Sequence, residues 1–310
     1  MQHSVPIYAM SRVSCAVMND RNLKHFLALA SHLHFGQASA ASNVSISALS
    51  RNIRQLEEET GATLFQRNNR SVSLTPQGAR FQVYAKEAIR QWNQICHQLA
   101  DKSDVLRGEI SLYCSVTASH SILFNLLDEF RQDYPGIEIK LHTGDPEHAI
   151  SRVVAGDEEV AIAARPAALP RGVQFKPITM SPLVFIAPRK SRDLELPTVG
   201  NQTPQQWAQV PMILSEGGLA RSRVNAWFRE KGITPRIYAQ VAGNEAIVSM
   251  VSLGLGIGVV PRLVLDNSPV ARNILVLDIK PQLEPYNVGL CALKKSLNDP
   301  LVAAFWGETG

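Results

Sequence analysis

The stretch ISALSRNIRQLEEET, at residues 46–60, constrains the fold more than any other part of the sequence. If it is a helix, successive side chains turn by about 100°, so its apolar residues fall on one stripe, formed by Leu49, Ile53 and Leu56. The opposite face carries hydroxyl and guanidinium groups, from Ser47, Ser50, Arg51 and Arg54. Ser45 is placed to cap the start of the helix, and Gly61 to end it. The pattern predicts a helix with one buried stripe and one basic face, which taken alone fits a solvated surface equally well.

The neighbouring segments favour a nucleic-acid-binding role for this helix. Residues 22–35 (NLKHFLALASHLHF) repeat apolar residues at helical spacing, and residues 36–45 predict a short helix and a tight turn. Helix, short helix, turn and longer helix is the order of a helix-turn-helix, whose last helix contacts base edges in the major groove. Residues 64–75 hold an Asn68-Asn69 turn between two short extended runs, which predicts a two-stranded wing.

Double-stranded DNA is therefore the expected partner of the N-terminal segment. The predicted DNA-binding residues are Ser45, Ile46, Ser47, Ser50, Arg51, Arg54, Arg67 and Arg70. The helix arginines are expected to enter the groove, whereas the two wing arginines are expected to contact phosphates. The glutamates at residues 57–59 are expected to face away from the DNA. The first 102 residues contain 11 Lys and Arg against 6 Asp and Glu, while residues 103–310 contain 20 against 21, which suits a DNA-binding head on a neutral body.

Length and composition narrow the class further. A chain of 310 residues with 45% hydrophobic content can build two or three domains. No apolar run reaches the ~18 residues of a membrane span, and the first 20 residues lack the pattern of a secretion signal. The cysteines lack pair spacing: they are Cys15, Cys96, Cys114 and Cys291. We expect a cytoplasmic protein without membrane association, disulfides, cofactor or metal site. Either translation starts at Met18 or residues 1–17 form a flexible extension.

A long helix is predicted to follow the wing. Thr75 and Pro76 form a good helix start, and apolar residues then recur at spacings of four and three: Phe81, Ala85, Ala88, Trp92, Ile95 and Leu99. Such a heptad stripe predicts a dimerisation helix that pairs with a second chain as a coiled coil. The alternative is that the stripe packs against the chain's own head.

The remaining residues predict an α/β body with parallel strands. Strands are expected at residues 109–116, 137–143, 159–164, 183–188 and 257–261, with helical patterns between them. Open α/β sheets bind ligands at the carboxyl ends of their strands, beside helix N-termini that favour anions. The polar groups at these junctions form the predicted effector site: Ser115, Thr117, Thr143, Gly144, Ser215 and Asn244. A small carboxylate with hydroxyl or keto groups would suit them, although each hydroxyl residue could also be a plain helix cap.

Enzymatic interpretations are weaker. The run GLGIGVVP at residues 254–261 lies between a helix and a following strand, the reverse of the order in a phosphate-binding loop. Ser115 and His120 lack a third orienting group, and His32 and His34 face different directions on a helix. The opposing hypothesis is a ligand-binding or catalytic α/β protein that carries a DNA-binding head.

The run ALSRNIRQLEEETGATLFQRNNRSVSLTPQG resembles the N-terminal signature of the LysR-type transcriptional regulators. It has their serine-arginine pair, Leu-Glu pair, Gly, Leu-Phe-x-Arg and Leu-Thr-x-x-Gly in order, and the residues just before it depart from the family pattern at Ser42 and Ile46. The resemblance implies an α/β fold class with an all-α head: a winged helix-turn-helix, a dimeric linker helix, and a two-lobed effector domain like that of periplasmic binding proteins. The expected domains are residues 18–75, 76–103 and 109–310, with one lobe at about 109–179 and 284–310 and the other at about 180–283.

Within this family, the body resembles activators of the acetohydroxy acid isomeroreductase gene. The resemblance rests on the stretches CSVTA, EIKLHTGD, EAIVSMVSLGLG, VLDNSP and AFW. It implies a regulator that activates this gene of isoleucine and valine biosynthesis when 2-acetolactate or 2-aceto-2-hydroxybutyrate binds, and that represses its own gene. It also implies a homodimer or homotetramer and RNA polymerase as a partner. The alternative is a regulator of the same type that responds to another small organic acid.

Overall fold

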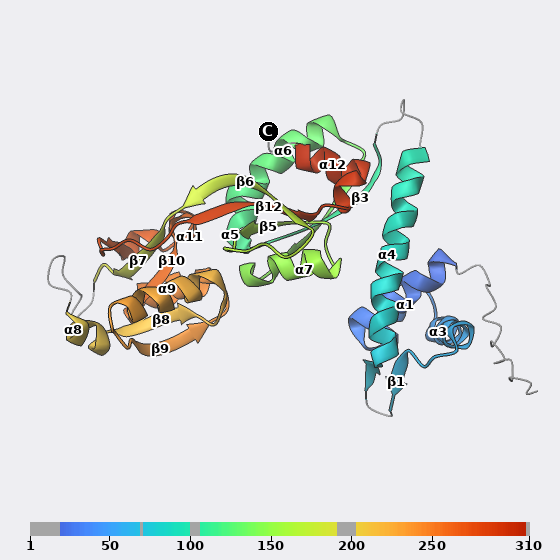
Figure 1. Cartoon of the computed structure of the whole chain (residues 1–310), viewed down its shortest axis with the longest axis horizontal. Coiled ribbons are helices and arrows are strands. Elements are labelled where there is room, and N and C mark those ends of the chain that lie inside the picture. The colour runs from blue at the N-terminus through green and yellow to red at the C-terminus, as the bar shows by residue number, and fades with distance from the viewer. Residues whose placement is uncertain (1–18, 69–70, 100–105, 191–202, 308–310) are drawn as a thin grey trace, which may run out of the picture. The chain divides into compact units, whose positions relative to one another are not determined.

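The computed structural model describes residues 19–68, 71–99, 106–190 and 203–307 (Figure 1). The chain forms two compact units, residues 1–99 and 100–310. Within the described ranges, no helix is both long enough and apolar enough to cross a membrane.

The N-terminal unit is a winged helix-turn-helix with a long C-terminal helix. Its elements are α1 (Asp20–His32), α2 (Phe35–Ala41), α3 (Ile46–Thr60), β1 (Phe65–Arg67), β2 (Val72–Leu74) and α4 (Pro76–Leu99). The Ser45 side chain accepts a hydrogen bond from the Ala48 amide, and Gly61 ends α3 at a φ of 64°. The antiparallel strands β1 and β2 are joined at Asn68, whose side chain accepts a hydrogen bond from the Ser71 amide at 2.7 Å. This is the architecture that the sequence predicts.

The core of the head forms between α1, α3, the wing and the first half of α4. The three residues of the predicted α3 stripe are fully buried: Leu49, Ile53 and Leu56. They belong to the same cluster as Phe26 of α1 and Phe65 of β1, whose ring centroids are 5.2 Å apart. A polar contact also links two helices, since the Asn52 side chain of α3 lies 2.7 Å from Nδ1 of the buried His25 of α1.

The C-terminal unit has two lobes, each built on a five-stranded sheet. The first sheet has the strand order β4-β3-β5-β12-β6, made of β3 (Gly108–Cys114), β4 (Ile137–Thr143), β5 (Val160–Ala164), β6 (Val173–Ser181) and β12 (Tyr286–Leu293). Its helices are α5 (Val116–Ala118), η1 (Ser119–Leu123), α6 (Phe124–Asp133), η2 (Pro146–His148), α7 (Ala149–Ala155), η4 (Ser296–Asn298) and α12 (Pro300–Gly307). In Figure 1, α6 and α12 lie on the side of this sheet opposite α7.

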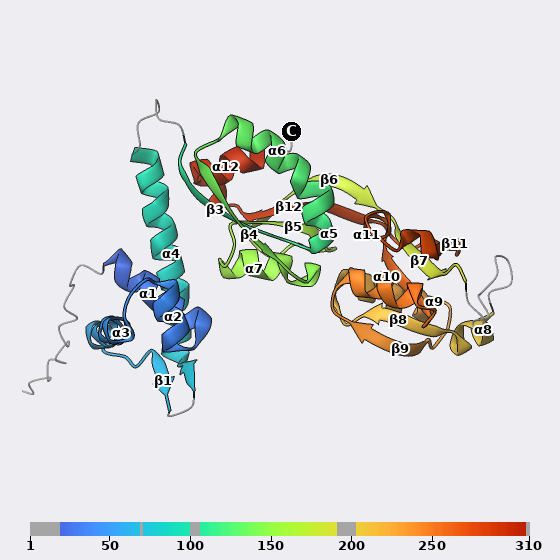
Figure 2. The same ribbon diagram turned by 180° about the vertical axis from the view of Figure 1, so that it is seen from behind.

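The second sheet has the order β11-β7-β10-β8-β9. Its strands are β7 (Leu183–Pro188), β8 (Pro211–Ser215), β9 (Arg236–Val241), β10 (Ile257–Pro261) and β11 (Ile274–Leu277). Its helices are α8 (Pro204–Gln209), α9 (Gly218–Glu230), α10 (Asn244–Ser252), α11 (Arg262–Asp266) and η3 (Ala271–Asn273), and Figure 2 shows α10 from the other side. A buried aromatic group fills this lobe: Phe185, Trp207, Trp227 and Phe228.

The prediction of parallel strands is wrong for part of each sheet. Strands β3, β4 and β5 are parallel, but β12 runs antiparallel to both β5 and β6. In the second sheet β8, β9 and β10 are parallel, whereas β7 and β11 are antiparallel to their neighbours. Strand β6 was not among the predicted strands; it lies at the edge of its sheet and contains Pro177 beside a register shift, both places where proline is tolerated.

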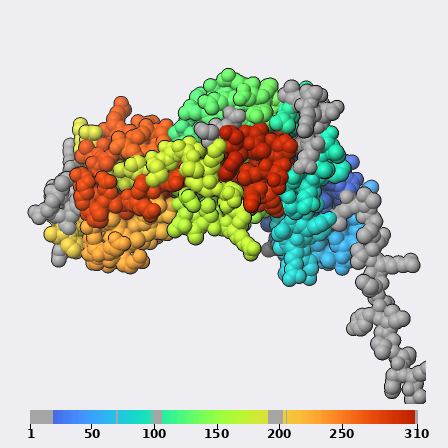
Figure 3. Space-filling view, turned by 45° about the horizontal axis from the view of Figure 1, so that its top comes forward, coloured from blue at the N-terminus to red at the C-terminus, as the bar shows by residue number. Residues whose placement is uncertain are grey.

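The mixed sheets follow from how the chain crosses between the lobes. It leaves the first lobe at Pro182, between β6 and β7, and returns between β11 and β12 through residues 278–285. The C-terminal strand thereby joins the sheet that the first strands began. Figure 3 shows this return of the chain on the surface, where red residues of the C-terminal end adjoin green residues of the first lobe. Orange residues gather in the second lobe.

Candidate DNA-binding face and effector cavity

The outward face of α3 carries the predicted groove-contacting side chains. Arg51 and Arg54 are exposed, and so is Ser47, while Ser50 is half-buried. Ile46, at the first position of the helix, is 55% exposed. Because the stripe on the other side of α3 is fully buried, the helix can present only this face to a groove.

The wing shows a contact that the sequence pattern did not predict. Glu57 of α3 accepts hydrogen bonds from the amides of Leu64 and Phe65 through Oε1, and its Oε2 pairs with Arg67 at 2.8 Å. The Arg67 guanidinium also lies 5.3 Å from the centre of the Phe35 ring. Arg67 therefore anchors the wing to α3, and Glu57 is a structural residue rather than part of a solvated acidic block. Arg70, the second predicted wing arginine, lies outside the described residues.

The predicted heptad stripe of α4 divides into two halves. Ala85 is fully buried in the head core, and Phe81 and Ala88 are partly buried against it. In this half, the alternative of packing against the chain's own head is what the structure shows. The second half presents large apolar side chains to solvent: Trp92 is 57% exposed, Ile95 44% and Leu99 78%.

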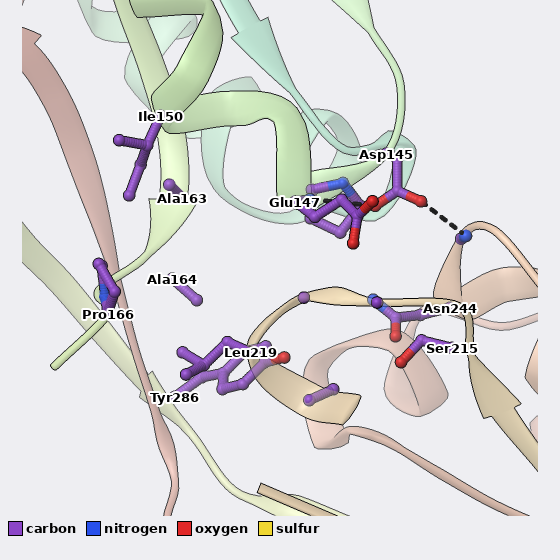
Figure 4. Close-up of a pocket in the computed structure, with 15 residues that line it drawn as sticks. Asp145, Glu147, Ile150, Ala163, Ala164, Pro166, Ser215, Leu219, Asn244 and Tyr286 are labelled. Carbon is purple, nitrogen blue, oxygen red and sulfur yellow. Dashed lines mark hydrogen bonds between the residues drawn. The ribbon is translucent and has the colours of Figure 1, made fainter. Parts of the chain in front are cut away.

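A cavity of about 160 Å³ lies between the two lobes of the C-terminal unit (Figure 4). The first lobe contributes Asp145, Glu147, Ile150 and the end of β5. The second lobe contributes Ser215, the first turn of α9, and Asn244 at the start of α10. The N-termini of α9 and α10 therefore both face a space in which free amides favour an anion. The polar Asn244 is 8% exposed and borders this space.

Two of the predicted effector residues line the cavity, Ser215 and Asn244, and the others do not. Ser115 accepts a hydrogen bond from the Ala118 amide at 3.2 Å and so is a helix cap. Thr117 donates through both its hydroxyl and its amide to Glu245 of the second lobe. Thr143 is exposed at the end of β4.

Gly144 shapes the cavity without lining it. The Tyr113 hydroxyl passes close to Gly144 and donates to the Asp145 carbonyl at 2.9 Å, so a Cβ at this glycine would clash with the hydroxyl. Asp145 is held further, because its Oδ1 accepts from the Glu147 amide at 3.0 Å and its Oδ2 from the Gly243 amide of the second lobe at 3.3 Å. The glycine thus permits the close packing that fixes Asp145 between the lobes.

Tyr286 forms the far wall of the cavity, at the start of β12. Burial raises the pKa of its hydroxyl well above the usual value, although Arg223, whose guanidinium lies 5.2 Å from the ring centre, acts in the opposite direction. The hydroxyl is therefore neutral. Figure 4 shows Tyr286 and Leu219 to the left of Ser215 and Asn244, with Asp145 and Glu147 above.

Sequence reasoning missed Glu147, Gly217, Tyr286 and Glu245. Glu147 lies three residues beyond the predicted Gly144, in the segment that follows β4. Tyr286 could not be found without the strand β12 that carries it. Glu245 adjoins the predicted Asn244, but only the fold reveals that it faces Thr117.

A winged helix-turn-helix head with a two-lobed, cavity-containing α/β unit defines the class of ligand-responsive transcriptional regulators. Residues 21–79 match the family described as bacterial regulatory helix-turn-helix protein, lysR family, and residues 103–309 match the LysR substrate binding domain. The chain therefore belongs to the LysR family of transcriptional regulators.

Individual relatives support the same assignment. The chain is 43% identical to the HTH-type transcriptional activator IlvY of Salmonella typhimurium, over 93% of this chain and 98% of the relative. It is also 43% identical to IlvY of Haemophilus influenzae, over 93% and 99% of the two chains. A full-length OxyR variant from Pseudomonas aeruginosa has the same fold, with a TM-score of 0.67, 19% identity and 94% of each chain covered. These relatives are regulators, and this chain is a regulator rather than an enzyme.

Proposed function

We propose that this protein activates the acetohydroxy acid isomeroreductase gene when 2-acetolactate or 2-aceto-2-hydroxybutyrate binds between its lobes, and that it represses its own gene. The observation that carries the proposal is the 43% identity to activators named IlvY, which spans the head and the body alike. A likeness confined to the head would support DNA binding alone. The alternative inducer is a different small organic acid.

The cavity suits an acid of this kind. The cavity, of about 160 Å³, is bordered by the first turns of two helices and by a few polar side chains, which suits a small organic acid. The amides at the N-termini of α9 and α10 would receive the carboxylate. Ser215 and the Asn244 side chain would then bind the hydroxyl and keto groups, which distinguish these acids from a simple fatty acid.

In the head, the α3 arginines would contact base edges and the wing would contact phosphates. Arg51 and Arg54 are exposed on the face opposite the buried stripe, as a groove-reading helix requires. Arg67 has a second role because it pairs with Glu57. Its loss should weaken DNA binding partly by loosening the wing.

Assembly would use the exposed half of α4. Trp92 and Ile95 border a shallow groove that also includes Tyr84 and Ala88, a surface able to accept the same helix of a second chain. A homodimer or homotetramer would place two heads on one operator, and RNA polymerase would be the further partner at the activated promoter. A regulator with these partners would act in the cytoplasm.

The mechanism is a linkage between two binding equilibria. An inducer that contacts both lobes favours one arrangement of the lobes over others, and the assembly then binds or bends its operator differently. By linkage, the operator must change the inducer's affinity by the same factor as the inducer changes the operator's.

The test is operator binding and bending on DNA from upstream of the isomeroreductase gene, with and without fresh acetolactate. We expect specific binding in both conditions and a change in bending when the acid is present. Arg51→Ala and Arg54→Ala should each weaken specific binding by roughly 1–3 kcal/mol if each makes a bidentate base contact. An unaltered complex with acetolactate, but an altered one with another organic acid, would favour the alternative inducer.

Variants of the cavity provide the internal control. Ser215→Ala and Asn244→Ala should raise the acetolactate concentration needed for the response at least about tenfold, because each removes a hydrogen bond to the ligand. Ser115→Ala is the matched control, since Ser115 caps a helix outside the cavity. It should lower the melting temperature and leave the inducer requirement unchanged. Equal effects of all three variants would contradict this placement of the inducer.

A further inference from the structure

Glu245 of the second lobe binds directly to the first lobe. Its Oε1 accepts a hydrogen bond from the Thr117 hydroxyl at 2.5 Å and another from the Thr117 amide at 3.1 Å. Thr117 is only 6% exposed, so these donors are enclosed by the contact. A carboxylate of the protein itself thus occupies the position where the sequence predicts a ligand carboxylate.

Two other carboxylates line the cavity itself, whereas Glu245 and Thr117 lie beside it, next to the lining residue Asn244. Asp145 accepts from the Gly243 amide at 3.3 Å, two residues before Glu245. Glu147 lies over the start of α9, where a Cβ on Gly217 would be 2.6 Å from its Oε2. His148 is 3.8 Å from Glu147 and is 61% exposed, so it offsets this charge weakly. The cleft therefore combines amides that attract one anion with fixed acids that repel a second.

From this arrangement we infer that Glu245 is a specificity-determining residue, which restricts the cavity to ligands with one carboxylate. The inference rests on the proposed function, because it concerns the same cavity. Glu245 acts in two ways: it occupies the Thr117 donors, and its charge repels an anion that approaches them. A ligand with a second carboxylate must displace Glu245 and leave it without its partners, whereas a ligand with a neutral keto group need not.

Thr117 and Asp145 lie at the same end of the first sheet, close to the start of α10. Thr117 follows β3 and Asp145 follows β4, and these parallel strands pair with Cys114 opposite Thr143. Both residues therefore lie at the carboxyl ends of these two parallel strands. Asn244, which borders the cavity, precedes Glu245 directly. A dicarboxylate bound at the N-terminus of α10 would extend its second carboxylate toward these strand ends, where Glu245 contacts Thr117.

The test compares two acids that differ at one group. 2-Acetolactate has a hydroxyl, a methyl, a carboxylate and a neutral acetyl group on one carbon, and 2-methylmalate carries a carboxymethyl group in place of the acetyl. Isothermal titration of the full-length protein should detect acetolactate at least about tenfold tighter than 2-methylmalate. Glu245→Ala frees the Thr117 donors and should tighten 2-methylmalate binding at least about tenfold, the effect of one hydrogen bond to a charged group. Glu245→Gln, which keeps an acceptor but removes the charge, should give an intermediate ratio.

Two further variants isolate the contact. Adding Thr117→Val to Glu245→Ala should remove most of the gained affinity for 2-methylmalate, because the hydroxyl donor is gone and only the backbone amide remains. Glu216→Gln removes an equal charge from an exposed residue next to the cavity and should leave the ratio unchanged. An equal shift in Glu216→Gln, or an unchanged ratio in Glu245→Ala, would overturn the inference. Operator binding and melting temperature check that each variant is folded.

Failure of the proposed function would look different. In that case the parent protein would bind neither acid, and Ser215→Ala would have no effect on any response. If only the specificity inference fails, the parent protein still binds acetolactate, and the Glu245 variants bind both acids in the same ratio as the parent.

Discussion

Trp92→Ala should separate the chains of the assembly and leave the head folded. Trp92 is 57% exposed on α4, and of the roughly 200 Å² that a tryptophan can bury, about 110 Å² is therefore free for a partner. At about 25 cal/mol per Å², burial of this surface contributes about 3 kcal/mol per chain. A symmetric seam contains the residue twice, so the variant loses roughly 5 kcal/mol per dimer, which raises the dissociation constant by nearly four orders of magnitude.

Sedimentation velocity over a broad dilution series measures this change. The parent protein should remain associated at concentrations where Trp92→Ala has dissociated, and the variant's operator affinity should fall because its two heads are no longer linked. Val83→Ala is the matched control: Val83 is 71% exposed on the same helix, but nine residues, or two and a half turns, place it on the opposite side from Trp92. It should sediment like the parent.

The buried half of the stripe gives the contrasting result. Phe81 packs edge to face on Phe26 at a centroid distance of 4.8 Å, within the head. Phe81→Ala should therefore lower the melting temperature of the head, at a cost somewhat below the roughly 3–5 kcal/mol of a fully buried phenylalanine. If Trp92→Ala associates as tightly as the parent protein, the exposed half of α4 is not the seam and the reasoning from exposure is refuted.

Three other outcomes are expected. Burial lowers the pKa of His25 below its usual 6.5, so the imidazole binds a proton more readily in the unfolded head than in the folded head. The free energy of unfolding should therefore be highest above about pH 6.5 and decline as the pH falls below it. Denaturant titrations should show that this pH dependence disappears in His25→Gln. Burial raises the pKa of the Cys291 thiol to about 12, so a thiol reagent at pH 8 should label the exposed Cys96 quickly and Cys291 only on unfolding, as mass spectrometry of the peptides would reveal. Gly144→Ala should destabilise the C-terminal unit by about 1–3 kcal/mol, because the added Cβ meets the Tyr113 hydroxyl. In a double-mutant cycle, the cost of Gly144→Ala should largely disappear when Tyr113→Phe has removed that hydroxyl. Additive effects of the two substitutions would contradict the clash.

The head could be predicted from sequence because its signals are local. The spacing of Leu49, Ile53 and Leu56 fixes which side of α3 is buried, and the cap at Ser45 lies three residues before the amide that it accepts from. Helix periodicity and turn chemistry act over a few residues, so a single sequence contains them. The division of the α4 stripe is different. Ala85 and Ile95 have the same apolar character, and only the position of the head decides which of them is covered.

The predicted junction residues only partly coincide with the lining of the cavity, for a related reason. Ser215 and Asn244 line the cavity, as expected for polar residues at strand-to-helix junctions. Ser115 and Thr117 satisfy the same pattern, but one caps its own helix and the other binds Glu245, which lies 128 residues away in sequence. A junction pattern identifies donors, whereas the long-range fold decides whether the protein's own acceptors already use them.

Those internal acceptors also limit how strongly the ligand and the operator can influence each other. The position of α10 against the first lobe depends on two carboxylate contacts, Asp145 with Gly243 and Glu245 with Thr117. A hydrogen bond to a charged group contributes about 1.5–3 kcal/mol, so opening this side of the cleft costs only a few kcal/mol, and water can replace the lost donors. A ligand shifts the equilibrium between the open and closed lobes by no more than its difference in binding free energy for the two arrangements.

By linkage, the operator's affinity changes by the same factor as the ligand's affinity. We therefore expect a coupling free energy of about 1–3 kcal/mol between the two binding sites. Glu245→Ala removes one of the two contacts, so it should also change operator bending in the absence of any inducer.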